Sequence, residues 1–119
     1  MRRHLIYIII GVAMLLSVSC GRQHDAEQTV KAFVEENLKE GVEISDRDFA
    51  DLGATRHISD SLIQMMRQRG ADLFKQGITY PEVPQGELYY LRMRYVNNGD
   101  TLQNTFYLNQ ELTAVIAFK

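Results

Sequence analysis

The residue types that could support catalysis lie together near the middle of the chain. A serine nucleophile needs a histidine as its base and an acid that orients the histidine. His57, Ser59 and Asp60 supply these types, with Ser61 next to them. Serine and aspartate just before an apolar periodic stretch are also common helix N-caps. We interpret Ser59 and Asp60 as helix caps and His57 as an isolated histidine, so we predict no catalytic residue.

Three nearby aspartates, Asp46, Asp48 and Asp51, could bind a divalent cation through their carboxylates. An EF-hand loop has glycine at its sixth position and glutamate at its twelfth. Counted from Asp46, these positions hold Asp51 and His57. His24 and His57 each have no second histidine or cysteine at ligand spacing. We therefore predict no metal and no cofactor.

The single cysteine, Cys20, follows a segment with the composition of a secretory signal. Such a signal has a basic start, an apolar region of about 7–15 residues and small residues at the cleavage site. Arg2-Arg3, Leu5–Leu16 and Ser17–Ser19 supply these parts in order. The apolar region is shorter than the roughly 20 residues of a membrane-spanning helix. The segment is therefore predicted to be a cleaved signal peptide.

The end of this segment resembles the lipobox of bacterial lipoproteins, in which a diacylglycerol is attached to the cysteine before cleavage. Val18, Ser19 and Cys20 suit that pattern, whereas Ser17 stands where the family prefers leucine. The resemblance implies a signal peptide over 1–19, lipidation of Cys20 and a membrane-anchored protein of the bacterial cell envelope. It leaves open whether the protein lies on the periplasmic or the outer-membrane side. Anchoring by two or three acyl chains is effectively permanent.

Without residues 1–19, 100 residues remain, enough for one domain with its own core. Two of the 13 basic residues lie in the removed segment, so 11 basic and 15 acidic residues give a net charge of −4. This charge gives no electrostatic reason to expect binding to nucleic acid. We interpret 20–24 as a lipidated leash and 25–119 as a single domain.

Two helices are predicted before a C-terminal β region. Apolar residues recur at helical spacing in Ala26–Glu40 and again in about Ser61–Gln76. Gly70 would lie within the second helix, where glycine costs about 1 kcal/mol relative to alanine. Between the helices, Ser45–Asp48 is turn-like, and we expect a short strand within Leu52–Ile58.

A β-hairpin is the clearest structural signal. Asn98-Gly99 between two alternating runs is typical of a two-residue type I′ turn. A two-residue loop pairs Asn97 with Asp100 and fixes the register of both strands. One nearly apolar face then contains the pairs Tyr95–Leu102, Met93–Asn104, Leu91–Phe106 and Tyr89–Leu108.

The opposite face of this hairpin contains two arginines and two tyrosines, Tyr90, Arg92, Arg94 and Tyr107. Tyrosine and arginine are enriched among the residues that contribute most to protein interfaces. We predict that this face binds an envelope protein or a small ligand. The alternative is an exposed sheet face without a partner.

The third strand of the meander is predicted over Leu112–Phe118, with its register open. A three-residue turn before it would continue the apolar face with Leu112, Ala114, Ile116 and Phe118, and a two-residue turn with Val115 and Ala117. We favour the first register because it buries more carbon.

The element order predicts an α+β domain with two helices on one face of an antiparallel sheet. Order and size are similar to small NTF2-like or cystatin-like lipoproteins of bacterial envelopes, a family of unknown function. The resemblance implies a curved sheet wrapped on the helices, and no reaction. We expect a non-enzymatic binding domain. The alternatives are a small enzyme with an NTF2-like pocket, using residues such as His57 and Asp60, or a purely structural lipoprotein.

Overall fold

The computed structural model describes residues 21–55 and 57–119, so the predicted signal peptide over 1–19 and Cys20 lie outside the described residues. A helix over residues 21–37 comes first, and we call it the first helix. The remaining elements are β1 (Ser45–Phe49), β2 (Gly53–Ala54), α2 (Asp60–Arg69), β3 (Tyr89–Asn97), β4 (Asp100–Leu108) and β5 (Val115–Phe118).

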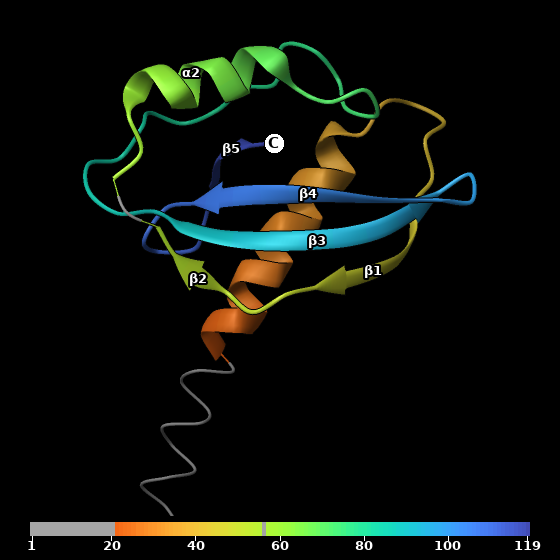
Figure 1. Ribbon diagram of the computed structural model, residues 1–119, viewed down its shortest axis with the longest axis horizontal. Coiled ribbons are helices and arrows are strands. Elements are labelled where there is room, and N and C mark those ends of the chain that lie inside the picture. Colours follow the sequence, from red (N-terminus) through yellow and green to blue (C-terminus); the bar gives the residue numbers. More distant parts are fainter. Residues whose placement is uncertain (1–20, 56) are drawn as a thin grey trace, which may run out of the picture.

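The strands form one five-stranded antiparallel sheet in the order β1-β3-β4-β5, with β2 also paired to β3. The α+β class and the C-terminal meander are therefore confirmed. The sheet is not strongly curled, so the expected curvature is wrong (Figure 1). Register shifts occur where β1 meets β3 and where β4 meets β5, whereas the central β3–β4 pair is regular. A bulge bends the strand that contains it. The regular β3–β4 pair at the centre of the sheet has no bulge to bend it.

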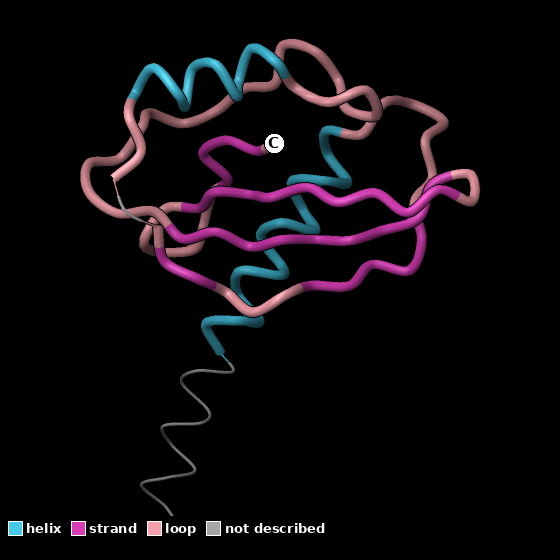
Figure 2. The backbone as a smooth tube through the Cα atoms, viewed as in Figure 1, coloured by secondary structure: helices cyan, strands magenta, loops and turns pink. Residues whose placement is uncertain are grey.

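The β3–β4 hairpin has the predicted register at every pair, from Tyr89–Leu108 to Asn97–Asp100. Asn98 has φ 50° and Gly99 has φ 82°, as a type I′ turn requires. Figure 2 shows the two strands side by side along their whole length. Which side chains enter the core is therefore fixed by this turn.

β5 combines parts of both registers that we considered. Phe118 pairs with Phe106 and Val115 pairs with Leu108, and a bulge lies between these pairs. Because of the bulge, both Val115 and Phe118 enter the core next to the first helix, whereas Ile116 contacts α2 residues instead. The favoured register is thus right for Phe118 and wrong for Ile116.

Residues 21–24, which we expected to form a flexible leash, are helical. The side chain of Gln23 makes two contacts from this turn. Its Nε2 donates to the Ala50 carbonyl at 3.0 Å, and its Oε1 accepts from the Leu52 amide at 2.7 Å. These long-range bonds attach the first turn to the β1–β2 connection, which local composition cannot reveal.

α2 begins as predicted, because Ser59 Oγ accepts a hydrogen bond from the Leu62 amide at 3.2 Å. It ends at Gly70 and does not continue to Gln76 as we expected. Gly70 has φ 60°, a conformation that ends helices and that only glycine adopts easily. The chain then runs antiparallel to the end of the first helix, with a bridge between Leu38 and Phe74.

Two further predictions change between the helices. The segment Ser45–Asp48, predicted to be turn-like, forms most of β1, and the left-handed Asp46 (φ 53°) lies at its register shift. The strand expected within Leu52–Ile58 is present only as the two residues of β2. β1 was missed because its residues are mostly exposed and show no apolar alternation.

The two helices do not share one face of the sheet, contrary to the prediction. The first helix covers one face, with Ala26, Val30 and Val34 fully buried against it. α2 lies along the β5 side, where Ile63 and Met66 form a separate small cluster (Figure 1). The bulge in β5 causes this arrangement, because it turns apolar side chains away from the first helix.

Aromatic rings fill the space between the first helix and the sheet. Phe106 and Phe118 stack with centroids 5.5 Å apart, Phe74 lies 4.7 Å from Phe118, and Phe33 meets both sheet rings edge-on. Such pairs stabilise by about 0.5–1.5 kcal/mol beyond their buried area.

We expect Phe118→Ala to lower the free energy of unfolding by about 3–5 kcal/mol, because it removes a fully buried ring from this cluster. Leu102→Ala is the control, since Leu102 is 37% exposed. Urea denaturation measures both variants. Equal midpoints for the two variants would contradict the assignment of Phe118 to the core.

Candidate functional site

The sheet brings together the four residues predicted to bind a partner. Tyr90, Arg92 and Arg94 alternate along β3 on the side away from the first helix, and Tyr107 pairs with Tyr90 on β4. Both arginines are exposed, and both tyrosines are half-buried. In Figure 1, β3 and β4 lie in front of the first helix, so this side faces the viewer. We call these four residues the Tyr/Arg face.

The Tyr90 ring is held by β2 beside it. A Cβ atom placed on Gly53 would lie 2.4 Å from Tyr90 Cζ, so only glycine leaves room for the ring in this position. The Arg92 guanidinium lies 5.6 Å from the centroid of the same ring, a cation–π distance. The Tyr90 ring therefore lies between Gly53 on the neighbouring strand and Arg92 two residues further along β3.

Tyr107 connects the Tyr/Arg face to α2. It packs against the small cluster that contains Ile63, Met66 and Ile116. One end of the face is thus supported by α2, while Arg94 at the other end is exposed and has only Asp48 and Gln103 as paired neighbours.

The residues whose types could support catalysis do not assemble into a site. Ser59 caps α2, and His57 and Asp60 are both exposed beside a shallow hollow. Within residues 21–55 and 57–119, no group of His, Cys, Asp or Glu side chains is placed to hold a metal ion. Asp46 and Asp48 belong instead to β1.

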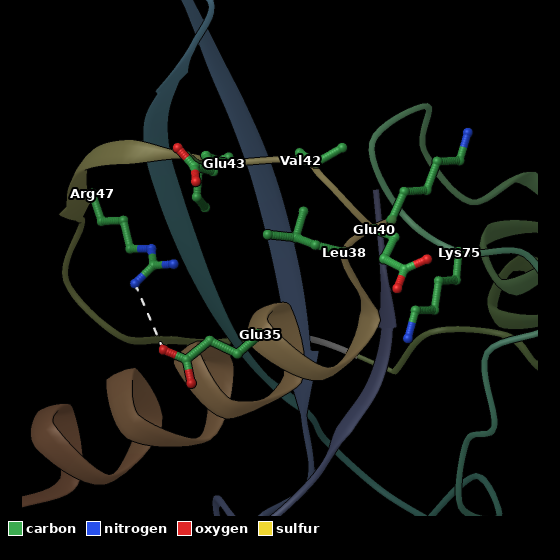
Figure 3. Close-up of a pocket in the computed structure, with 9 residues that line it drawn as sticks. Glu35, Leu38, Glu40, Val42, Glu43, Arg47 and Lys75 are labelled. Carbon is green, nitrogen blue, oxygen red and sulfur yellow. Dashed lines mark ion pairs between the residues drawn. The ribbon is translucent and has the colours of Figure 1, made fainter.

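A cleft of about 550 Å³ lies between the end of the first helix and the segment that leads into β1 (Figure 3). Arg47 Nη1 lies 4.0 Å from Glu35 Oε1 at one side, and Glu40 and Lys75 line the other. The charges are mixed and the cleft is open, so it lacks the enclosure that strengthens an acid–base pair.

The interior contains the polar side chain of Asn104 and the hydroxyl groups of Tyr95 and Tyr80. Asn104, the polar residue on the otherwise apolar hairpin face, accepts a short hydrogen bond from the Tyr95 hydroxyl and donates to the Lys119 carbonyl at 3.2 Å. Burial raises the pKa of Tyr80 to about 12, although the nearby Arg67 charge opposes this rise. Burial also raises the pKa of Tyr95, so both hydroxyls keep their protons near neutral pH and neither acts as a base there.

Sequence reasoning missed Arg67, whose role depends on contacts across the fold. Its Nε donates to the Ile116 carbonyl at 2.8 Å, and its Nη2 donates to the Pro81 carbonyl at 2.8 Å. Its guanidinium also lies 4.7 Å from the Tyr80 ring centroid. Basic residues are common in the last turn of a helix because they interact favourably with the helix dipole. The position of Arg67 in the sequence therefore did not indicate its contacts with β5 and the Pro81 loop.

No protein-family model matches the chain, and no match was found among the curated proteins or the solved structures. In the described part of the chain, no helix is both long and apolar enough to cross a bilayer. Function must therefore be argued from the residues themselves.

Gly53→Ala should move the Tyr90 ring, because the new methyl group cannot coexist with it. The expected result is a changed near-ultraviolet circular dichroism spectrum and a loss of stability below about 1.5 kcal/mol. Gly21→Ala is the matched control, since a Cβ there meets nothing within 4 Å. Identical spectra for wild type and both variants would show that Tyr90 does not lie over Gly53.

Proposed function

We propose that the protein is a lipid-anchored protein of the bacterial cell envelope whose domain binds a partner protein through the Tyr/Arg face. The observation that carries the anchor is the sequence order of a basic pair, the apolar stretch Leu5–Leu16, small residues and then Cys20. The domain is of the NTF2-like or cystatin-like kind in this proposal, on the evidence of element order and size.

The interior geometry supports binding over catalysis. In an NTF2-like enzyme, the pocket lies between the helix and the sheet. Here that space contains the packed rings of Phe33, Phe74, Phe106 and Phe118. The Tyr/Arg face, by contrast, presents rigid aromatic rings and charged groups to solvent, which is the composition of an interface hot spot.

Cys20→Ala should prevent acylation, because the thiol is the only group to which the diacylglycerol can be attached. We expect wild-type protein in the membrane fraction with an acylated N-terminal Cys20 by intact mass spectrometry, and the variant outside that fraction. Ser19→Ala is the control, since it keeps a small residue before the cysteine. Wild-type protein that still begins at Met1 without a lipid would contradict the anchor.

Photo-crosslinking tests the binding surface. A benzophenone amino acid at Gln103, which is exposed on the Tyr/Arg side of β4, should give a discrete crosslinked product in intact membranes. The same group at Gln68, exposed on α2, should not give that product. The same product from both positions, or none from Gln103, would contradict a partner on this face.

A further inference from the structure

We infer that the Tyr/Arg face recognises an acidic, extended segment of a partner protein. This inference rests on the proposed function and specifies the chemistry of the partner. It begins from the position of two exposed guanidinium groups on one strand.

Arg92 and Arg94 are two residues apart on β3 and point to the same side. Residues at this spacing in a strand repeat about every 6.6 Å. An extended peptide with an acidic residue at every second position has the same repeat. Two of its carboxylates can therefore meet both guanidinium groups at once, each through two parallel N–H···O bonds.

Neither arginine is held in an ion pair by a described residue of the protein. In the described part of the chain, the ion pair is Arg47 with Glu35, and neither Arg92 nor Arg94 forms one. On β4 the paired residues are Thr105 and Gln103, both uncharged. On β1 the acidic Asp48 pairs with Arg94, but the two side chains form no ion pair within 4.0 Å. Charge complementarity therefore calls for an anionic partner.

The net charge of −4 favours a short acidic segment over a long polyanion as the partner of this face. At physiological ionic strength, charges interact over about 8 Å before they are screened. A short segment bound on β3 therefore interacts electrostatically mainly with the two arginines there. A nucleic acid or an anionic bilayer would extend over the remaining surface, where acidic residues outnumber basic ones.

The site is also ordered before binding. Arg92 is held over the Tyr90 ring, and that ring is held over Gly53. A side chain that is already fixed loses less conformational entropy when it binds, which favours affinity. The strand that carries both arginines is bonded on both sides, by β1 and β2 on one and β4 on the other.

The test uses the full-length lipoprotein in detergent and a fluorescent ten-residue peptide of alternating threonine and glutamate. Fluorescence anisotropy measures binding, and a peptide with glutamine in place of glutamate is the ligand control. We expect Arg92→Gln and Arg94→Gln each to weaken binding at least about tenfold, because each removes a charge-assisted hydrogen bond. Arg69→Gln, an exposed arginine on α2, should change binding less than about twofold.

Three results would overturn the inference: equal binding of the glutamine peptide, unchanged binding by Arg92→Gln and Arg94→Gln, or displacement of the peptide by glycerol phosphate at a lower concentration than by free acidic peptide. The last result would assign the arginines to lipid headgroups. If any of these occurs while Gln103 still crosslinks, only the acidic chemistry is wrong. If Gln103 also fails to crosslink, the binding function is wrong as well.

Discussion

The structure depends on the register of the β3–β4 hairpin. Asn98 and Gly99 both adopt left-handed conformations, which restricts the loop to two residues and aligns the strands on either side. A slip by one residue would turn Arg92 and Arg94 into the core and expose Leu91 and Met93. One turn therefore determines both the buried face on which the first helix packs and the charged face that remains in solvent.

The free edges of the sheet are protected in two different ways. At β5, α2 covers the edge, and Arg67 donates to the Ile116 carbonyl, which would otherwise be open to another strand. At β1, exposed charged residues and the left-handed Asp46 occupy the edge. Unpaired edges invite association with other chains. These features disfavour strand pairing at the edges, which is consistent with the proposed binding on the face of the sheet.

Structural features that depend on neighbouring residues could be predicted from the sequence, whereas features that depend on contacts between distant residues could not. The hairpin register and the Ser59 cap follow from residues within a few positions of each other, and both are confirmed. The helical residues 21–24 are attached through Gln23 bonds to a segment 27 and 29 residues away, which local patterns do not reveal. Hydrophobic periodicity does not specify the bulge in β5, which divides the apolar residues of this strand between two clusters.

The same limit applies to the site. The membership of the Tyr/Arg face was predicted correctly from the alternation and the turn, because cross-strand neighbours follow from the register alone. The support from Gly53 could not be predicted, since β2 has only two residues and little sequence signature. What the structure adds is therefore the rigid position of Tyr90 and the absence of an ion pair at either arginine of the face within the described residues.

The central claim is that a partner occupies this face in the envelope. Arginine modification by phenylglyoxal, read by mass spectrometry in intact membranes and in the purified protein, tests it most directly. We predict that Arg92 and Arg94 are modified in the purified protein and protected in membranes, while Arg69 is modified equally in both. Equal modification of all three arginines in both preparations would contradict the account.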